Sequence, residues 1–273
     1  MNYRHAFHAG NFADLVKHAA LLSMLRELTK GAQPLTVIDT HGGAGTYDLT
    51  GDMAVRSGEA AEGIGRLMAD AGAPKGLRPL KQAVARFNEG ALKRYPGSPV
   101  LAAQALRKND RLIACEVHPD DHALLARALA TFPNAQALKA DGYRTVADQT
   151  SAGRLLVLID PPFERPDDYE QAARALGGVL RKNRSAAVAV WLPLKDLETF
   201  DAFLRRIAFA TGALVAEVRL RLLLDPMKMN GCALVIANPP AGVETALREA
   251  AQWVVGALGE AGGQARLWRL GGA

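Results

Sequence analysis

The chain has 273 residues, of which 49% are hydrophobic, enough for one sizeable core and too many for a disordered segment. A formal charge of +5 permits a polyanionic partner such as RNA but suits an ordinary basic enzyme equally well. No run of about 18 apolar residues suggests a membrane span, and the N-terminal residues lack the layout of a signal peptide. The two cysteines, Cys115 and Cys232, lie in apolar runs, so we expect reduced thiols and a cytoplasmic location.

The N-terminal part of the chain predicts a helix, a strand and a glycine loop, in that order. Asn11 can cap a helix over residues 12–30, which Gly31 can end. The short apolar run over residues 35–38 ends at Asp39 and is typical of a buried parallel strand. The glycine-containing loop that follows allows the backbone to approach a ligand closely.

Residues 51–97 differ from the rest because they contain no run of β-branched residues. Two helical patterns fit this stretch, one over residues 59–71 and one over residues 79–88. Strands resume after it, so we expect a helical insertion subdomain within a core formed by residues 1–50 and 98–273.

Strands alternate with helices from residue 98 onward, where Ser98 at the cap position and Pro99 at the first helical position open a helix. Apolar runs predict strands over residues 112–117, 135–140, 155–159, 186–192, 214–224, 233–237 and 265–270. Helices are expected over residues 98–108, 167–182, 197–211 and 244–258, and another opens at Pro119. This alternation predicts an α/β fold with a doubly wound, mostly parallel, Rossmann-like sheet. No helix fits between the strands over 214–224 and 233–237, so they should form an antiparallel edge hairpin, as in a class I S-adenosylmethionine methyltransferase.

Four of the expected strands end in an acid: Asp39, Glu116, Asp141 and Asp160. Ligands of open α/β sheets lie beyond the carboxyl ends of the strands, so these side chains should share one polar pocket. Glu116 is placed to accept hydrogen bonds from both hydroxyls of a ribose. Asp141, followed by Gly142, can accept from an adenine amine but also fits a plain turn.

The glycine loop suits S-adenosylmethionine better than a phosphate. Gly43 and Gly45 match two glycines of the nicotinamide fingerprint, but Asp48 stands at the third position, and no triphosphate-loop lysine follows. Asp39 would repel a phosphate, whereas S-adenosylmethionine carries a positive sulfonium and a positive ammonium. A plain glycine turn between strand and helix remains an alternative for this loop taken alone.

The most specific signal is Asp160-Pro161-Pro162-Phe163, which ends the most apolar strand. The prolines fix the backbone, so the Asp160 carboxylate and the Pro161 carbonyl can both accept from one NH2 group. Such acceptors would hold an aromatic amine with its lone pair towards the methyl group and stabilise the developing positive charge. Phe163 offers a face on which an extruded base could stack. The tetrapeptide therefore predicts an amine methyltransferase with Asp160 as its catalytic residue, and a proline-rich turn is the alternative.

The histidines give weaker signals. No Cys/His spacing fits a metal site, so we expect no metal. His41 lies inside the glycine loop and is expected near the cofactor, whereas the pattern around His18 on the first helix favours a structural role.

Several stretches along nearly the whole chain resemble one known family. They are residues 3–11 with Lys17-His18, residues 39–45, 95–99, 116–119, 139–142 and 160–164, and Asn238-Pro239-Pro240. In them the chain resembles the bacterial RlmJ family, the adenine-N(6) methyltransferases of 23S ribosomal RNA. The N-terminal stretch is far more specific to this family than the tetrapeptide is.

The resemblance implies methylation of the N(6) amine of adenine 2030 in 23S rRNA, with S-adenosyl-L-methionine as the methyl donor. It assigns to the cofactor pocket His18, His41, Ser98, Glu116, Asp141, Gly142 and Asp160. It places Tyr3 in an N-terminal arm near the target base, beside the substrate contacts expected of Pro161 and Phe163. The expected partner is 23S rRNA, as naked or early-assembly RNA, and the protein is expected to be a monomer.

The chain departs from the family pattern at three places. Gly43 stands where alanine is common, and Phe163 stands where tyrosine is usual, which removes a hydroxyl but keeps a stacking face. The hairpin loop over residues 225–231 is short and carries Lys228 as its one basic residue, which leaves its contacts with RNA open.

Two alternatives to rRNA methylation remain. A DNA adenine-N(6) methyltransferase uses the same tetrapeptide, although no separate DNA-recognition domain is evident. A non-catalytic RNA-binding module on a methyltransferase fold would have no need of the full set of strand-end acids.

Overall fold

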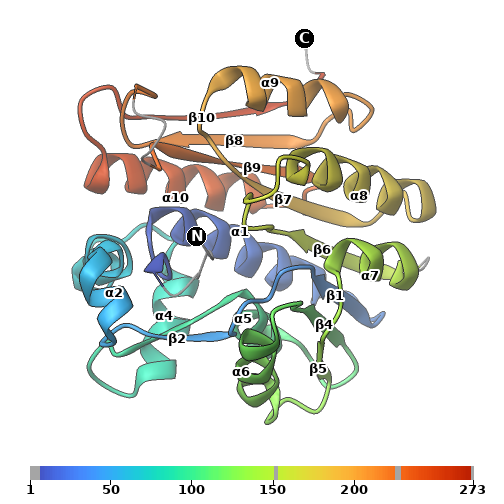
Figure 1. Cartoon of the computed structure of the whole chain (residues 1–273), viewed down its shortest axis with the longest axis horizontal. Coiled ribbons are helices and arrows are strands. Elements are labelled where there is room, and N and C mark those ends of the chain that lie inside the picture. Colours follow the sequence, from blue (N-terminus) through green and yellow to red (C-terminus); the bar gives the residue numbers. More distant parts are fainter. Residues whose placement is uncertain (1–6, 151–152, 225–228, 272–273) are drawn as a thin grey trace.

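The computed structural model describes residues 7–150, 153–224 and 229–271, and within these ranges one eight-stranded sheet organises the molecule (Figure 1). The strands follow the order β10-β8-β9-β7-β6-β1-β4-β5. Their bounds are β1 (Leu35–Asp39), β4 (Arg111–Cys115), β5 (Ala135–Leu138), β6 (Arg154–Ile159), β7 (Ala187–Pro193), β8 (Leu214–Arg219), β9 (Gly231–Ala237) and β10 (Gln264–Arg269). The run from β7 to β5 is parallel, which confirms the predicted mostly parallel α/β sheet.

The predicted hairpin is confirmed, but it does not form the outer edge of the sheet. β8 pairs antiparallel with β9, and β9 pairs antiparallel with β7. β10 then pairs antiparallel with β8 and is itself the edge strand. The last strand was predicted from its apolar run, but a run of residues does not reveal which neighbour a strand will choose.

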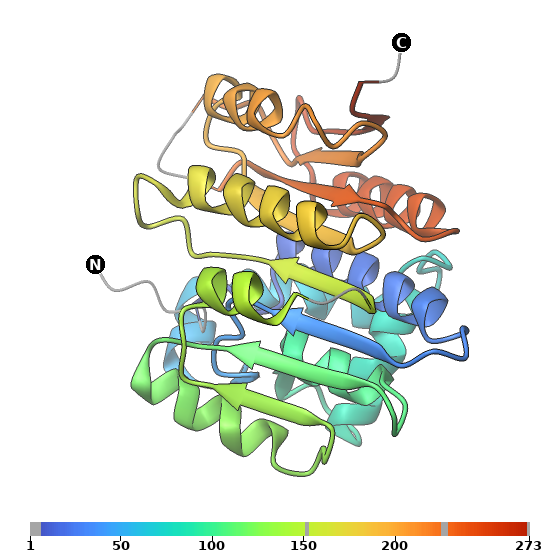
Figure 2. The same cartoon turned by 90° about the vertical axis from the view of Figure 1, so that its right-hand side faces the viewer.

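Helices cover both faces of the sheet (Figure 2). On one side α1 packs against α5 and α10, and on the other side α7 packs against α8, which contacts α9. Their bounds are α1 (Phe12–Leu28), α5 (Ser98–Ala105), α6 (Pro119–Leu129), α7 (Gly142–Gln149), α8 (Asp168–Lys182), α9 (Leu197–Arg206) and α10 (Val243–Leu258). Among the described residues, no helix combines the length and the apolar character needed to cross a membrane.

Two starts of helices differ from the prediction. Gly97, not Ser98, occupies the cap position of α5, so the Ser98 side chain is released from capping. α7 was not predicted: it begins directly after Asp141, for which the sequence left open a contact with an adenine amine or a plain turn. α5 therefore begins one residue earlier than predicted, and Asp141 is a residue type that fits both a turn and a helix cap.

Residues 51–97 contain α2 (Asp52–Ser57), a π-helical turn (Ala61–Gly65), α3 (Arg66–Ala69), α4 (Arg78–Asn88) and β3 (Arg94–Pro96). β3 pairs with β2 (Thr46–Asp48) in a small antiparallel sheet that brings the two ends of this segment together. The segment also bonds to α10, because Trp253 Nε1 donates to Asp70 at 2.6 Å and the Gly76 N–H donates to Glu249 at 2.6 Å. Its status as a separate insertion subdomain stays a prediction.

α1 is buried along most of its length although it carries polar and charged residues. Asp14, Lys17 and His18 are exposed by only 2%, 4% and 1%. Charged side chains are rarely buried unless they are paired, so this stretch of α1 needs partners from elsewhere in the fold. Those partners lie at the carboxyl end of the sheet.

Candidate active site

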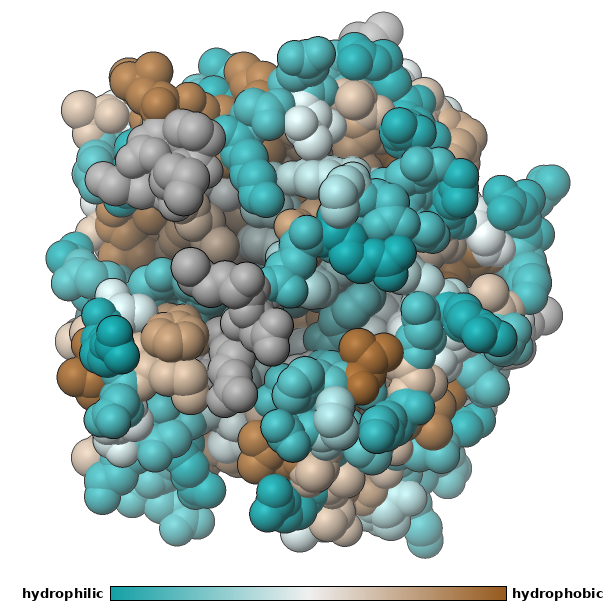
Figure 3. Space-filling model, in the orientation of Figure 1, coloured by the Kyte–Doolittle hydropathy of each residue, from teal (hydrophilic) through white to brown (hydrophobic). Residues whose placement is uncertain are grey.

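A cavity of about 290 Å³ lies beyond the carboxyl ends of the parallel strands. Its walls come from the first half of α1, the loop after β1, the start of α5 and the segments that follow β4 and β6. The face of the molecule that carries these strand ends is largely hydrophilic, with hydrophobic side chains in scattered groups (Figure 3). The position is the one expected for a ligand of an open α/β sheet.

The structure brings most of the predicted site residues into this cavity. Those that line it are His18, His41, Ser98, Glu116, Asp160 and Pro161. Asp141, Gly142 and Phe163 lie outside its lining. Tyr3 falls outside the described residues.

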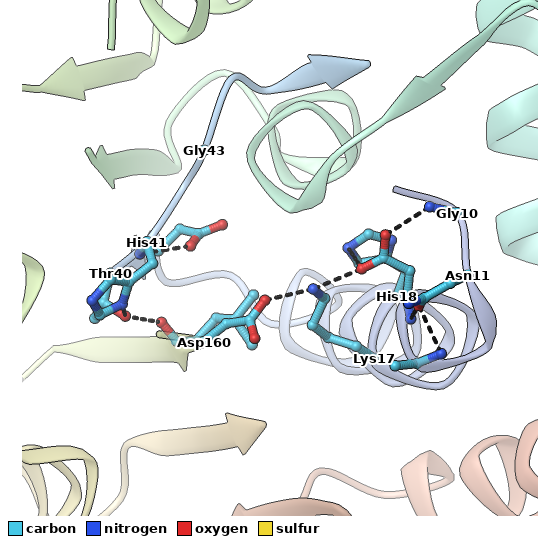
Figure 4. A network of polar contacts seen from close by, with 12 residues as sticks. Gly10, Asn11, Lys17, His18, Thr40, His41, Gly43 and Asp160 are labelled. Atoms are coloured by element: carbon cyan, nitrogen blue, oxygen red, sulfur yellow. Dashed lines mark hydrogen bonds and ion pairs between the residues drawn. The ribbon is translucent and has the colours of Figure 1, made fainter. Parts of the chain in front are cut away.

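Asp160 is joined to α1 by a buried lysine (Figure 4). Lys17 Nζ lies 2.5 Å from Asp160 Oδ2 and 2.8 Å from Asp14 Oδ1. Burial acts to lower the pKa of Lys17, but the two carboxylates outweigh it and hold that pKa well above its ordinary value. The lysine is therefore charged at every physiological pH, and one charged group orients the acid at the head of the tetrapeptide.

The N-terminal end of α1 is fixed by the residues that precede it. Asn11 accepts hydrogen bonds from the N–H groups of Ala13 and Asp14 at 3.0 and 3.1 Å, which confirms the predicted cap. The Gly10 N–H, at a positive φ of 79°, donates to Asp14 Oδ2 at 2.8 Å. The backbone turn before the helix thus holds Asp14 in place for Lys17.

Glu59 connects this turn with the segment over residues 51–97. Asn11 Nδ2 donates to one Glu59 oxygen at 2.9 Å, and His8 Nδ1 lies 3.0 Å from both. The hydrogen bond with Glu59 raises the pKa of His8 against the opposing effect of burial. His8 and Asn11 both line the cavity, so Glu59 helps to shape its rim from outside.

His18 lines the cavity and belongs to the same network. Its Nδ1 is 2.7 Å from the hydroxyl of the fully buried Tyr95, and the two rings stack with centroids 5.5 Å apart. Its Nε2 lies 3.9 Å from Asp14 Oδ1. These contacts support the structural role that the sequence pattern favours, and a role at the cofactor stays a prediction.

Ser98 lines the cavity and forms a second buried polar pair with Asp39, which lies outside the lining although it was predicted to share the pocket. Both residues are buried, and the Ser98 side chain hydrogen-bonds to the Asp39 carboxylate instead of capping α5. Burial raises the pKa of Asp39 from 3.8 to about 6, and the charge of Asp160 adds to the rise. Ser98 and Lys17 act in the opposite direction without cancelling it.

A pH dependence of stability follows from Asp39. An acid whose pKa is raised binds its proton more tightly in the folded protein than in the unfolded chain, so stability falls as pH rises from about 4 through about 6. A rise of this size corresponds to up to about 3 kcal/mol. Asparagine at position 39 carries no titratable proton, so Asp39→Asn should not show this loss. We therefore expect the free energy of unfolding of the variant minus that of the wild type to be larger at pH 8 than at pH 4.5. Urea unfolding of both proteins at both pH values tests this. The same difference between variant and wild type at pH 4.5 and pH 8 would contradict it.

His41 presents an uncharged acceptor to the cavity. The packing around its ring lowers its pKa to about 4, although Asp160 and Asp141 act to raise it. The Thr40 hydroxyl donates to the Leu158 carbonyl at 3.1 Å, so it accepts from His41 Nδ1–H at 2.7 Å. This assigns the proton to Nδ1 and leaves the Nε2 lone pair as an acceptor.

Glu116 bridges the glycine loop and the segment after β4. Its Oε2 accepts from the Gly43 N–H at 3.0 Å, and its Oε1 accepts from the His118 N–H at 2.8 Å. Each carboxylate oxygen keeps a further lone pair, so both can accept a second donor. The predicted contact with ribose hydroxyls is compatible with this arrangement and stays a prediction.

Asp141 and Gly142 form the start of α7. The Asp141 side chain caps the helix by accepting from the Arg144 N–H at 3.1 Å. Gly142 is buried against the loop after β1, where an added Cβ would lie 1.9 Å from the Thr40 carbonyl oxygen. The glycine therefore allows α7 to approach that loop, and a direct role of either residue at the cofactor stays a prediction.

We expect Gly142→Ala to destabilise the protein by roughly 1–3 kcal/mol or more, because backbone and not a mobile side chain blocks the new methyl group. Gly256→Ala is the matched control. Gly256 lies in α10 with no atom within 4 Å of an added Cβ, so alanine there should stabilise by about 0.5–1 kcal/mol. Thermal unfolding of both variants would contradict this account if they behaved alike.

The tetrapeptide is split between the cavity and the core. Pro161 and Pro162 line the cavity, whereas Phe163 is 6% exposed and packs against Tyr169 and Trp191 at centroid distances of 4.6 and 5.9 Å. Phe163 also has a φ of +52°, a conformation that non-glycine residues adopt infrequently and often at functional sites. The expected stacking of a base on Phe163 stays a prediction, and this conformation offers the base no exposed face.

Sequence reasoning missed Lys17, Asp14 and Trp191 as residues of the site. Lys17 and Asp14 belong to the network around Asp160 as described, and Trp191 from β7 lines the cavity while 8% exposed. Asp14, Lys17 and His18 are spaced at i, i+3 and i+4 on an otherwise apolar helix. This spacing was the sequence signal that could have identified Asp14 and Lys17 as a buried polar group. Among the described residues, no group of three or more side chains is arranged to hold a metal ion.

Comparison with known proteins points to one family. A family model described as "Ribosomal RNA large subunit methyltransferase D, RlmJ" matches residues 32–270. The protein named "Ribosomal RNA large subunit methyltransferase J" of Escherichia coli K12 is 31% identical over 267 residues, or 96% of this chain and 95% of its own. The Haemophilus influenzae protein of the same name is 32% identical and covers 91% of each chain. A crystal structure of a Legionella pneumophila protein, 28% identical, superposes with a TM-score of 0.90 over 97% of this chain and 99% of its own.

Proposed function

Because the chain belongs to the RlmJ family of ribosomal RNA large subunit methyltransferases, we propose that it methylates the N(6) amine of an adenine in 23S rRNA. The methyl donor is S-adenosyl-L-methionine, and the target is the adenine 2030 position that the sequence resemblance implies. The observation that carries this proposal is Asp160, held by Lys17 at the wall of the cavity and followed by Pro161 and Pro162. We also propose that the protein acts in the cytoplasm as a monomer, on naked or early-assembly RNA.

The chemistry of the cavity suits S-adenosylmethionine. Among the described residues its lining holds five carboxylates and one lysine, and that lysine is already paired with Asp14 and Asp160. A cationic ligand is favoured in such surroundings and a phosphate is not. Gly43 also lines the cavity with a φ of +58°, and a Cβ there would lie 2.2 Å from the Tyr47 hydroxyl, so with Tyr47 in this position the loop of this chain favours glycine. When bound, S-adenosylmethionine supplies an electrophilic methyl group on a positive sulfur.

Asp160 can hold the amine that receives the methyl group. Oδ2 accepts from Lys17, and within the described residues no hydrogen bond reaches Oδ1. Oδ1 and the Pro161 carbonyl can therefore both accept from one exocyclic NH2 group, which turns its lone pair out of conjugation with the ring. In the transfer the S–C bond of the sulfonium would break as the N–C bond forms, so the sulfur would leave as a neutral thioether and the amine would become positive. These two acceptors stabilise that charge. The proton then leaves the amine to Asp160 or to water.

Lys17 fixes the geometry of this step. A carboxylate alone at the wall of the cavity could rotate, whereas an ion pair of 2.5 Å within a buried triad holds it in one orientation. Glu116 and His41 would contribute acceptors for the bound cofactor, Glu116 through its second lone pairs and His41 through Nε2.

Mass spectrometry of rRNA from a deletion strain tests the proposed function. The proposal expects one N(6)-methyladenine of 23S rRNA to disappear, and to return with the wild-type gene but not with an Asp160→Asn copy. Unchanged methyladenine in the deletion strain would contradict it.

A further inference from the structure

A second hollow, of about 570 Å³, lies at the opposite end of the strands from the cavity. It is formed where the C-terminal end of α8, the connection from α9 to β8 and the end of β9 meet. Figure 2 shows the parallel strands running towards one side of the molecule and β9 running towards the other. β7 has seven residues, so at about 3.3 Å per residue roughly 20 Å of strand separates the two hollows.

Two arginines give this hollow a positive charge. Arg181 and Arg184 line it, and the described lining contains no carboxylate. Neither arginine has an ion pair with any residue that the structure describes, whereas Arg174 on the same helix pairs with Glu170, and Arg205 on α9 pairs with Asp201. Both guanidinium groups therefore remain available to an anion from outside.

An aromatic ring lies beside the arginines. Phe209 is 57% exposed, which is unusual for a large apolar side chain. Its Cζ would be 3.1 Å from a Cβ at Gly177, and Arg181 Nη1 would be 3.4 Å from the same atom. Gly177 sits inside α8, where glycine costs about 1 kcal/mol relative to alanine. The absence of a side chain there makes room for Phe209 and Arg181 to lie side by side over the helix.

Asn238, the first residue of the motif Asn238-Pro239-Pro240, forms part of the wall of the hollow. Asn238 lines it at a φ of +49°, and its Nδ2 donates to the carbonyls of Arg184 at 2.8 Å and Ala186 at 2.9 Å. This side chain fixes the backbone that carries Arg184. The motif is one of those by which the sequence resembles its family, yet it lies far from the cavity and has no part in the proposed chemistry.

We propose that this hollow binds a strand of the RNA substrate, with phosphates at Arg181 and Arg184 and an unstacked base on Phe209. The inference rests on the proposed function, because the rRNA substrate of that function is long enough to contact the cavity and this hollow at the same time. Basic side chains next to an exposed aromatic ring are the combination with which proteins typically bind single-stranded nucleic acid. A neutral peptide would leave the arginines unused, and a free phosphate would leave the aromatic ring unused.

RNA binding measured against salt concentration tests the proposal. Fluorescence anisotropy would follow a labelled 23S rRNA fragment bound to full-length protein, wild type or R181Q/R184Q. Since each lost phosphate contact lowers the slope of log affinity against log salt by about 0.7–0.9, we expect the slope to fall by roughly 1–2. Affinity should fall about tenfold or more at low salt, and F209A should weaken binding about fivefold or more at every salt concentration. The matched control is R174Q/R205Q, which removes two exposed arginines outside the hollow.

Further measurements separate this role from a structural one. R181Q/R184Q should raise KM for RNA, while kcat and the affinity for S-adenosylmethionine stay at wild-type values and thermal unfolding changes no more than in the control. The proposal is overturned if R181Q/R184Q binds RNA as tightly as R174Q/R205Q does, or if it loses binding of inorganic phosphate alone with RNA affinity unchanged. Absence of methyl transfer by the wild type would instead contradict the proposed function, so the two failures are distinguishable.

Discussion

Asp160→Asn should lower kcat for methyl transfer by about 10²–10³-fold, because it removes the charged acceptor that stabilises the developing positive amine. The amide is similar in shape, so the cavity should keep its form, and the affinity for S-adenosylmethionine measured by calorimetry should change much less than kcat. Single-turnover assays with labelled cofactor and RNA separate this effect on the chemical step from an effect on product release.

Asp121→Asn is the control for the Asp160 variant. Asp121 also lines the cavity, but it lies on α6, outside the triad of Asp14, Lys17 and Asp160. We expect its kcat to stay close to that of the wild type. Equal losses in both variants would mean that the summed negative charge of the cavity matters and that Asp160 has no special position.

Lys17→Met should destabilise the folded protein by about 3–5 kcal/mol, because removal of one partner leaves buried carboxylates without compensation. Lys17 is 4% exposed and bonds to both Asp14 and Asp160, so methionine fills its volume but supplies no charge. Methyl transfer should fall as well, since Asp160 loses the group that orients it. Urea unfolding gives the change in free energy of unfolding.

The double variant Asp14→Asn/Lys17→Met tests whether the triad acts as one unit. An asparagine at position 14 would keep a hydrogen-bonding oxygen for the Gly10 N–H while one buried negative charge is removed. We therefore expect the double variant to be more stable than Lys17→Met alone, but to recover little activity. Additive losses of stability in the two single changes would show that Asp14 and Lys17 are not coupled.

The position of the site could be predicted from the sequence, because ligands of open α/β sheets bind beyond the carboxyl ends of the parallel strands. Once Asp39, Glu116 and Asp160 were placed after parallel strands, their arrival at one end of the sheet followed from the fold class, and Glu116 and Asp160, but not Asp39, line the cavity. Asn11 as a helix cap followed from local chemistry in the same way.

What the sequence did not reveal depends on contacts between distant parts of the chain. Lys17 and Asp160 are 143 residues apart, and no local pattern tells which acid a buried lysine will meet. Phe163 follows two prolines that suggest an exposed turn, but its ring fits between Tyr169 and Trp191, which only the packed structure brings together. Ser98 binds Asp39 instead of capping α5 because Gly97 takes the cap position.

The most direct test of the central claim is transfer of a labelled methyl group from S-adenosylmethionine to unmodified 23S rRNA in vitro, with the product nucleotide mapped. Duplex DNA and protein-free single-stranded DNA serve as competing acceptors in the same assay. We expect N(6)-methyladenine at one adenine of the rRNA with the wild-type protein, and none with Asp160→Asn. Transfer to DNA in preference to rRNA, or a methyl group on any atom other than N(6) of adenine, would contradict it.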